Sequence, residues 1–192
     1  MTNIIIRMLD IFLSITILLV SSPIILFSAV FIALSMGVPV IFTQKRLGLN
    51  NEVFLLYKFR SMINNPNLSD EERITSFGRF IRKTSIDELP QLLNVLIGNM
   101  SLVGPRPLLP EYKEHFTQEQ LKRHDVKPGI TGWAQVNGRN SLTWEEKFNL
   151  DLYFVSNYSV SLYLKVVYKT FFVVLLSKGF SLSGEAKRFD DK

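Results

Sequence analysis

Two adjacent carboxylates, Asp87 and Glu88, follow a basic pair, Arg82 and Lys83, in this chain of 192 residues. An ionised aspartate can attack phosphorus and form an acyl phosphate. A neighbouring carboxylate can hold a divalent metal that bridges phosphate oxygens and neutralises their charge. Because two acids among several cations are typical of phosphoryl-transfer sites, Asp87 is a candidate nucleophile and Glu88 a candidate metal ligand.

The same acids also allow a purely structural interpretation. Ser85 and Glu88 have the spacing of a capping box, in which a hydroxyl and a carboxylate three residues later close the start of a helix. The run 89–97 then repeats apolar residues at helical spacing, so the acids would only complement the helix dipole. Spacing alone favours this interpretation, although the same helix start would also offer unpaired N–H groups to a phosphate.

Several other kinds of site are excluded by what the sequence lacks. The chain has no cysteine, which excludes thiol chemistry, zinc thiolates and disulfides. It has no P-loop, no G-x-G-x-x-G fingerprint and no D-x-D pair of ordinary metal-dependent glycosyltransferases. The net charge of +5 suits an anionic lipid surface or a phosphorylated substrate. Nucleic acid is disfavoured as a partner, because no recognised binding motif is present.

The elements that must position these residues include a long apolar segment. Residues 11–44 carry no charged side chain, and a helix of that length would be about 50 Å long. Since this exceeds the roughly 30 Å hydrocarbon core of a bilayer, the segment is predicted to be embedded in a membrane. Pro23 would kink the helix, and the preceding Ser22 could satisfy a carbonyl that the kink frees. Both a kinked spanning helix and a re-entrant helix-break-helix remain open, because the positive charges on the two flanks are nearly equal.

The rest of the chain is predicted to form one small, mainly helical α+β domain. Two strands, 40–46 and 53–62, read as a β-hairpin that would place Lys58 and Arg60 on one face. The segment 127–140 contains four Pro or Gly residues and is expected to be a structured, functional loop. Helices are expected at 70–83, at 110–124, after a capping box at Thr143 and Glu146, and at 160–176, the last as a core or interfacial amphipathic helix.

Five motifs together resemble the bacterial sugar transferase family. Within it, the chain is similar to the small monotopic phosphoglycosyl transferases of the bacillosamine-phosphate transferase type, which start glycan assembly on a polyprenol phosphate. The resemblance runs from about residue 6 to about residue 178 and is specific because the motifs occur in this order. The motifs are Phe42-Thr-Gln44, Tyr57-Lys-Phe-Arg-Ser-Met62, Thr84-Ser-Ile-Asp-Glu-Leu-Pro-Gln-Leu-Leu-Asn-Val95, Ser101-Leu-Val-Gly-Pro-Arg-Pro107 and Lys127-Pro-Gly-Ile-Thr-Gly-Trp-Ala-Gln-Val-Asn-Gly-Arg-Asn140.

The resemblance implies a mechanism. Asp87 would attack the β-phosphate of a UDP-sugar, UMP would leave, and a covalent phosphosugar-aspartate would remain. Undecaprenyl phosphate or another polyprenol phosphate would then take the sugar phosphate. Glu88, with Asp87, would bind Mg²⁺. The remaining site residues implied are the phosphate-binding Lys58, Arg82 and Arg139 and the structural turn Pro105-Arg106-Pro107 near the nucleotide.

The resemblance also implies an architecture. Residues 1–39 would form a re-entrant membrane helix broken at Ser22-Pro23, residues 40–180 the catalytic domain, and residues 181–192 a flexible tail. The catalytic domain would lie on the cytoplasmic face of the bacterial inner membrane. The sequence leaves open the sugar, the glycan pathway and whether the protein is a monomer or a homodimer. The rival hypothesis is a membrane-anchored scaffold that binds anionic lipid, which would need neither the Asp-Glu pair nor Arg139.

Overall fold

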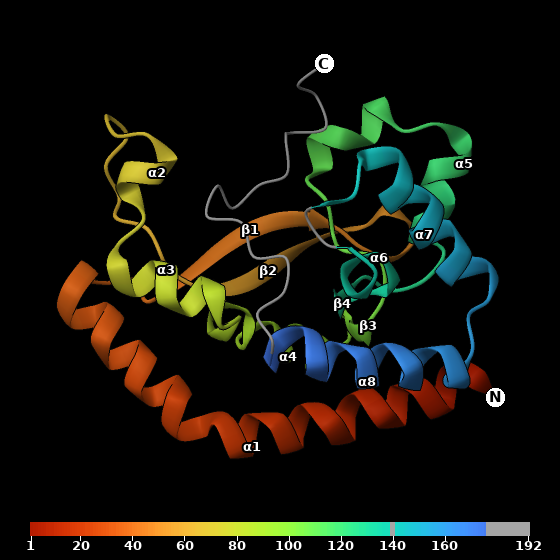
Figure 1. Ribbon diagram of the computed structural model, residues 1–192, viewed down its shortest axis with the longest axis horizontal. Coiled ribbons are helices and arrows are strands. Elements are labelled where there is room, and N and C mark those ends of the chain that lie inside the picture. Colours follow the sequence, from red (N-terminus) through yellow and green to blue (C-terminus); the bar gives the residue numbers. More distant parts are fainter. Residues whose placement is uncertain (139–140, 176–192) are drawn as a thin grey trace.

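The protein, seen in a computed structural model, is described for residues 1–138 and 141–175 and is mainly helical, with two small sheets (Figure 1). This confirms the predicted α+β class. The predicted tail 181–192 lies outside the described residues. The helices and strands in chain order are α1 (Thr2–Met36), β1 (Ile41–Leu47), β2 (Val53–Phe59), α2 (Asp70–Arg73), α3 (Ser76–Lys83), α4 (Gln91–Ile97), β3 (Ser101–Val103), α5 (Gln118–Leu121), β4 (Gly129–Thr131), α6 (Trp133–Val136), α7 (Trp144–Ser156) and α8 (Val160–Leu175).

Helix α1 runs without interruption through Pro23. A proline lacks the backbone donor, so the carbonyl four residues before it loses its partner. That carbonyl belongs to Leu19, and it accepts a hydrogen bond from the Ser22 hydroxyl at 2.8 Å. The predicted role of the serine is therefore confirmed. The expected break is instead a bend near the middle of a continuous helix (Figure 1).

The first turns of α1 are fixed to the rest of the protein by polar contacts. Arg7 donates to the last carbonyls of α4, those of Val95 at 2.6 Å and Leu96 at 2.8 Å. Asp10 is only 2% exposed and accepts three hydrogen bonds from the β3 region and α8. The donors are the Ser101 hydroxyl (3.0 Å), the Leu102 amide (2.8 Å) and the Tyr163 hydroxyl (2.8 Å).

The last turns of α1 are fixed to the same body. Ile32 is fully buried in a cluster with Phe59 of β2 and Ile81 of α3. Arg60 donates to the Met36 carbonyl at the end of the helix, where a cation also complements the helix dipole. Both ends of α1 therefore contact the globular part of the protein, and the helix lies along one edge of it (Figure 1).

The predicted β-hairpin is confirmed as the antiparallel pair β1 and β2. Strand β2 ends at Phe59, three residues earlier than expected, and Arg60 turns to α1. Lys58 and Arg60 therefore serve different contacts. On the other edge of β2, the buried Asn94 of α4 donates to the Leu55 carbonyl at 2.7 Å and accepts from the Tyr57 amide at 3.0 Å. These bonds fix α4, which follows the two acids in the chain, to the hairpin.

The loop expected at 127–140 is structured, because β4 pairs in parallel with β3 and α6 follows. The two backbones approach so closely that a Cβ on Gly129 would lie 2.0 Å from the Gly104 amide nitrogen. A Cβ on Gly104 would lie 2.2 Å from the Lys127 carbonyl oxygen. These two glycines are therefore required by packing between the strands.

Two helices expected from the sequence are divided. The segment 70–83 forms α2 and α3, because Ser69 and Thr75 each cap a separate helix start with their hydroxyl oxygen. The segment 110–124 forms a 3₁₀ turn at Pro110–His115, the short helix α5 and a second 3₁₀ turn. The predicted capping box of Thr143 and Glu146 at the start of α7 is confirmed.

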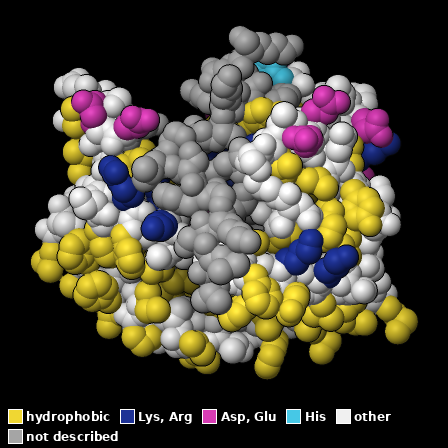
Figure 2. Space-filling model, in the orientation of Figure 1, with side chains coloured by type: hydrophobic (Ala, Val, Ile, Leu, Met, Phe, Trp, Pro, Cys, Tyr) yellow, Lys and Arg dark blue, Asp and Glu magenta, His cyan; other side chains and the backbone are white. Residues whose placement is uncertain are grey.

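Helix α8 has one face in the core, as one of the two predictions requires, and an exposed apolar face. Tyr163 and Val166 are fully buried in the main core. Lys165 and Lys169 lie over the Trp133 ring, with their ammonium nitrogens 5.4 and 4.7 Å from its centre. Figure 2 shows hydrophobic side chains along the edge where α1 and α8 lie. The exposed hydrophobic residues of α8 are Leu164, Tyr168, Phe171, Phe172 and Val174.

Candidate active site

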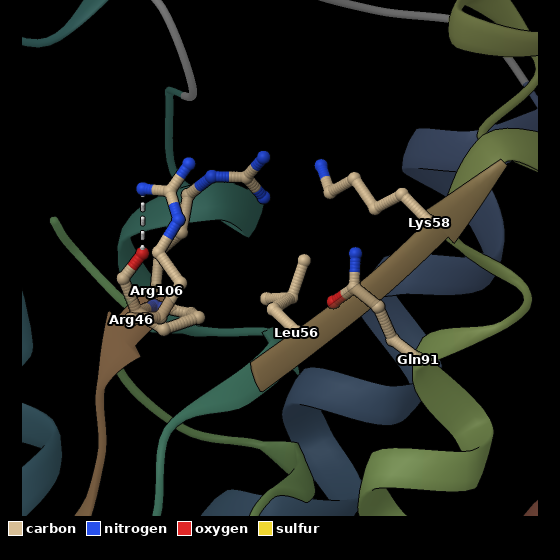
Figure 3. Close-up of a pocket in the computed structure, with 6 residues that line it drawn as sticks. Arg46, Leu56, Lys58, Gln91 and Arg106 are labelled. Atoms are coloured by element: carbon tan, nitrogen blue, oxygen red, sulfur yellow. Dashed lines mark hydrogen bonds between the residues drawn. The ribbon is translucent and has the colours of Figure 1, made fainter. Parts of the chain in front are cut away.

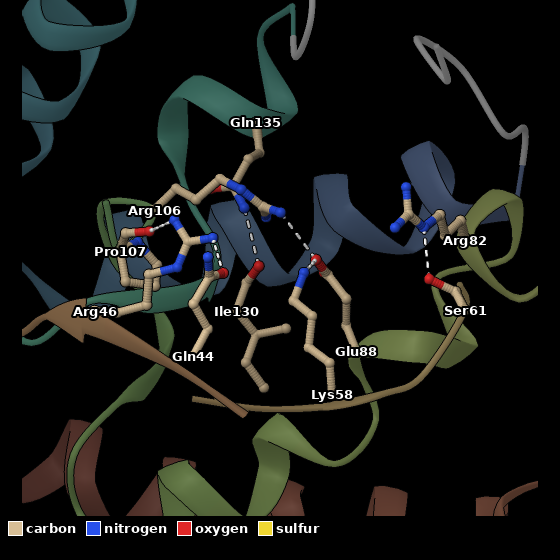
Figure 4. A network of polar contacts seen from close by, with 10 residues as sticks. All are labelled: Gln44, Arg46, Lys58, Ser61, Arg82, Glu88, Arg106, Pro107, Ile130 and Gln135. Carbon is tan, nitrogen blue, oxygen red and sulfur yellow. Dashed lines mark hydrogen bonds and ion pairs between the residues drawn. The ribbon is translucent and has the colours of Figure 1, made fainter. Parts of the chain in front are cut away.

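Lys58 and Arg106 reach the same space from two different elements (Figure 3). Lys58 comes from β2, and Arg106 follows β3. Both bind Oε1 of Glu88, at 2.9 Å for the Lys58 ammonium and 3.0 Å for the Arg106 guanidinium (Figure 4). The Lys58 and Glu88 side chains are 20% and 18% exposed, so their pair is largely shielded from water. Three distant segments of the chain thus meet at one carboxylate.

The neighbouring carboxyl groups of Asp87 and Glu88 differ in pKa. Burial, and then repulsion by Glu88, raises the pKa of Asp87 to about 6, although three nearby cations act in the opposite direction. Burial also opposes ionisation of Glu88, but attraction by Lys58 and Arg106 outweighs it and holds that pKa well below its usual range. Glu88 is therefore ionised and paired. The Asp87 carboxylate forms no hydrogen bond or ion pair with a described residue, and its higher pKa makes it the more basic oxygen.

The capping box expected at Ser85 and Glu88 is wrong. Ser85 has a φ of 58° and its side chain caps no backbone N–H. Glu88 bonds to Lys58 and Arg106 instead, because charge-assisted hydrogen bonds are stronger than a neutral cap. The acids lie in a 3₁₀ turn, and α4 begins only at Gln91 and spans 7 residues. The site therefore depends on side-chain cations and not on the dipole of a long helix.

Arg82 is placed beside the acids by close packing of α3. Its Nε donates to the Ser61 hydroxyl at 2.8 Å (Figure 4). A Cβ on Gly78 would lie 1.9 Å from the Ser61 carbonyl oxygen, so α3 can approach this segment only with glycine there. Arg82 is one of the charges that lower the pKa of Asp87, which places it within electrostatic reach of that carboxylate.

The turn Pro105-Arg106-Pro107 is held through its backbone. The carbonyls of residues 105–108 all accept hydrogen bonds, and the prolines limit φ on both sides of Arg106. The turn therefore fixes the position from which Arg106 reaches Glu88. The Pro105 carbonyl accepts from the Gly129 amide (3.0 Å), and the Arg106 carbonyl accepts from Arg123 Nη2 (2.9 Å). The Pro107 carbonyl accepts from Arg46 Nη1 (3.3 Å), and the Leu108 carbonyl accepts from the Leu47 amide (2.9 Å).

Arg123 and Asp151 form a buried ion pair that sequence reasoning missed. Arg123 Nη2 lies 2.6 Å from Asp151 Oδ2, and the two side chains are 3% and 5% exposed. The same nitrogen donates to the Arg106 carbonyl, so the pair connects α7 to the turn that carries Arg106. The one signal in the sequence is an acid on the apolar face of a predicted helix, three residues after Phe148.

The other predicted site residues fall into two groups. Ser22 and Pro23 are exposed residues within α1 and shape that helix, where the Ser22 hydroxyl bonds to the Leu19 carbonyl. Arg139 lies outside the described residues. The predicted residues that the structure brings together are Lys58, Arg82, Asp87, Glu88 and the turn Pro105-Arg106-Pro107.

The family model of bacterial sugar transferases matches residues 1–177, which is nearly the whole chain. The chain belongs to the bacterial sugar transferase family. The predicted family is thereby confirmed, and so is a transferase in place of a non-catalytic scaffold. This sugar transferase is 50% identical over 190 residues to the uncharacterized sugar transferase EpsL of Bacillus subtilis, covering 95% of this chain and 94% of EpsL.

Two further relatives carry names that state a reaction. The UDP-glucose:undecaprenyl-phosphate glucose-1-phosphate transferase of Escherichia coli is 40% identical over 88% of this chain. The undecaprenyl-phosphate galactose phosphotransferase of Salmonella typhimurium is 37% identical over 90% of this chain. The chain spans only 40% and 41% of these two longer proteins. This sugar transferase therefore corresponds to one part of each of them and to nearly all of EpsL.

The raised pKa of Asp87 predicts how the sugar transferase responds to pH. If Asp87 is the nucleophile that the family resemblance implies, only its ionised form can attack, so the single-turnover rate of nucleotide release should fall about tenfold per pH unit below a midpoint near 6. Working without a lipid acceptor keeps the titration of the acceptor phosphate out of the measurement. In Glu88→Gln the repulsion is removed and the midpoint should move to lower pH. A rate that is independent of pH between 5 and 7 would contradict the assignment.

Proposed function

We propose that this sugar transferase moves a sugar 1-phosphate from a UDP-sugar to undecaprenyl phosphate and releases UMP. The observation that carries the proposal is the Asp87 carboxylate, which is buried, unpaired among the described residues and beside cations that suit a diphosphate. The names of the Escherichia coli and Salmonella typhimurium relatives support the two substrate classes. Relatives with similar identities are named for glucose, galactose and N-acetylgalactosamine, so the donor sugar is left unspecified.

In the first step, an Asp87 oxygen attacks the β-phosphorus of the UDP-sugar. A bond forms between that oxygen and phosphorus, and the bond from phosphorus to the bridging oxygen breaks, so that UMP leaves with the bridging oxygen. Lys58, Arg82 and Arg106 stabilise the phosphate charges around this step. The raised pKa of Asp87 favours attack because a more basic carboxylate is the better nucleophile.

In the second step, the phosphate oxygen of undecaprenyl phosphate attacks the same phosphorus. The bond between phosphorus and the Asp87 oxygen breaks, and the products are undecaprenyl-diphosphate-sugar and the free carboxylate. Glu88 is a poorer nucleophile than Asp87, because attraction by Lys58 and Arg106 holds its pKa well below its usual range. This two-step scheme would serve as the first membrane step of glycan or polysaccharide biosynthesis.

The two carboxylates fit Mg²⁺ as a cofactor. Among the described residues no group of three or more His, Cys, Asp or Glu side chains comes together. Mg²⁺ is commonly held by one or two carboxylates while water and substrate phosphates complete its shell. Asp87 and Glu88 would hold the ion, which would neutralise charge on the phosphates. Because Glu88 already forms ion pairs with the Lys58 and Arg106 side chains, we expect weak Mg²⁺ binding without nucleotide.

We further propose that α1 is re-entrant in the bacterial inner membrane and that the site lies on the cytoplasmic face. Only α1, among the described residues, is long and apolar enough to cross a bilayer. Its two ends both bond to the globular part of the protein, through the Asp10 carboxylate and the Met36 carbonyl. Val20, near the middle of the helix, is 77% exposed. Hydrophobic side chains line this edge, and the acidic side chains visible in Figure 2 lie on the opposite side of the molecule.

The activity is tested with detergent-solubilised protein, Mg²⁺, undecaprenyl phosphate and a panel of UDP-sugars. With the correct sugar we expect UMP in a one-to-one ratio with the lipid-linked product. Omission of the lipid should leave a single burst of UMP equal to the enzyme concentration, because the covalent intermediate accumulates. Release of UDP in place of UMP would show that the sugar is transferred without its phosphate, contrary to the proposal.

The topology is tested with single cysteines, which are clean probes because the natural chain has none. Cysteines at Thr2 and Asn50 should both react with a membrane-impermeant maleimide from the cytoplasmic side. A cysteine at Val20, in the exposed middle of α1, should react only after detergent is added. Labelling of positions 2 and 50 from opposite sides would establish a spanning helix instead.

A further inference from the structure

A second group of polar side chains continues beyond Glu88, on the side away from Arg82 (Figure 4). It surrounds a small pocket in which Gln91, Lys58 and Arg106 converge above Leu56 (Figure 3). Arg46 forms the far wall, where it donates to the Pro107 carbonyl at 3.3 Å and to Gln44 at 2.6 Å. The side chains of Arg46, Lys58 and Arg106 therefore line one pocket. Among the described residues, no carboxylate is part of its lining.

Gln91 gives this pocket a specific donor. Its side chain is only 2% exposed, and its Nε2 has no hydrogen-bond partner within the described residues. A buried donor without a partner costs about 1–3 kcal/mol. A fold keeps such a group most readily when a ligand completes its hydrogen bonds. The amide also lies one helical turn after Asp87, so it is close to the reacting centre.

We propose that Arg46, Gln91 and Arg106 bind the α-phosphate of the nucleotide, and hence hold UMP as it leaves. This inference rests on the proposed function. In phosphoryl transfer the leaving oxygen lies roughly opposite the attacking one. The cations follow one another from Arg82 past Lys58 to Arg106 and Arg46 (Figure 4). The sugar phosphate thus lies at the Arg82 end, and the leaving nucleotide at the Arg46 end.

Arg106 connects the pocket to the acids. The pocket has room for about one water molecule, ≈ 10 Å³, so a phosphate must displace a side chain to enter. Arg106 is 49% exposed and is held at its tip by one 3.0 Å contact to Glu88. When the Arg106 guanidinium binds the α-phosphate, its contact with Glu88 Oε1 is broken, and only Lys58 still donates to that oxygen. Nucleotide binding therefore makes Glu88 available to a metal ion.

The experiment measures UMP binding by titration calorimetry in detergent with Mg²⁺, which needs no turnover. Gln91→Glu keeps the shape of the side chain and places a negative charge in the pocket, so UMP affinity should fall at least tenfold. Gln118→Glu makes the same charge change on an exposed position of α5 and should bind UMP like the natural protein. Uridine, which lacks the phosphate, should bind equally to all three proteins.

Two further measurements make each outcome decisive. Gln91→Met removes the donor without adding charge and should lower UMP affinity by a smaller factor. If thermal melting shows that Gln91→Glu does not fold, the UMP affinity of Gln91→Met is the measurement that tests the proposal. Unchanged UMP affinity in a folded Gln91 variant would overturn the pocket assignment, even if UMP release from a UDP-sugar is intact. If affinity falls as expected but no UDP-sugar yields UMP, the proposed reaction fails and the nucleotide pocket stands.

Discussion

Asp87→Asn is expected to abolish sugar-phosphate transfer and, at the same time, to stabilise the fold. The amide cannot form the acyl phosphate, so the UMP burst should disappear and turnover should fall by roughly 10⁴-fold or more, as for other nucleophile removals. Binding of UMP should change little, because Asp87 does not line the pocket that we propose for the leaving nucleotide. The expected result is thus a protein that binds nucleotide but forms no covalent intermediate.

The stability effect of the same substitution follows from the pKa of Asp87. Burial raises that pKa from 3.8 to about 6, so the folded state disfavours the ionised form. The stabilisation due to a protonated Asp87 is fully present below pH 4 and is lost as the pH rises through about 6. At pH 7.5 a neutral asparagine removes this penalty, which is about 1–3 kcal/mol.

Melting temperatures measured between pH 5 and 8 check this prediction. We expect the difference between Asp87→Asn and the natural protein to grow with pH and to level off above about pH 7. Glu88→Gln is the matched control, because it neutralises the adjacent acid but removes two ion-pair contacts, and it should destabilise the fold. Retention of near-normal turnover by Asp87→Asn would exclude Asp87 as the nucleophile.

Sequence reasoning found the charged residues that converge, since short motifs carry most of them. Lys58, Arg82 and Glu88 all lie in or next to such motifs. Spacing alone, however, favoured a capping box at Ser85, and the structure shows no such cap. Local pattern rules cannot detect that Lys58, 30 positions away in the chain, competes for Glu88. The long-range ion pair decides the local conformation.

The residues that sequence reasoning missed all act over long distances in the chain. Asn94 falls within the apolar helical run 89–97, yet it bonds to the backbone of β2 across 37 and 39 positions. Asp10 is the last charged residue before the apolar segment 11–44, yet it is 2% exposed and accepts from groups as far as 153 positions away. A polar residue on an apolar face is the usable signal in both cases.

Asp151→Asn is expected to be among the most destabilising single changes in the protein. It leaves the guanidinium of Arg123, which is 3% exposed, without its counter-ion. Breaking one side of a buried pair typically costs 3–5 kcal/mol, because the remaining charge stays buried without compensation. Chemical denaturation in detergent should show this loss. The matched control is Asp125→Asn, which neutralises an exposed acid and should change stability by less than about 0.5 kcal/mol.

The double variant Arg123→Met with Asp151→Leu separates stability from the positioning of Arg106. Replacing a buried ion pair by apolar residues of similar size is often neutral, so the double variant should recover most of the stability that Asp151→Asn loses. It cannot restore the 2.9 Å hydrogen bond from Arg123 to the Arg106 carbonyl. We therefore expect a stable protein whose kcat/KM is roughly 10–100-fold lower, since a small misplacement of a charged group can have that effect. Full activity in a stable double variant would show that Arg123 supports the fold alone, and that the other three carbonyl contacts are enough to hold the turn.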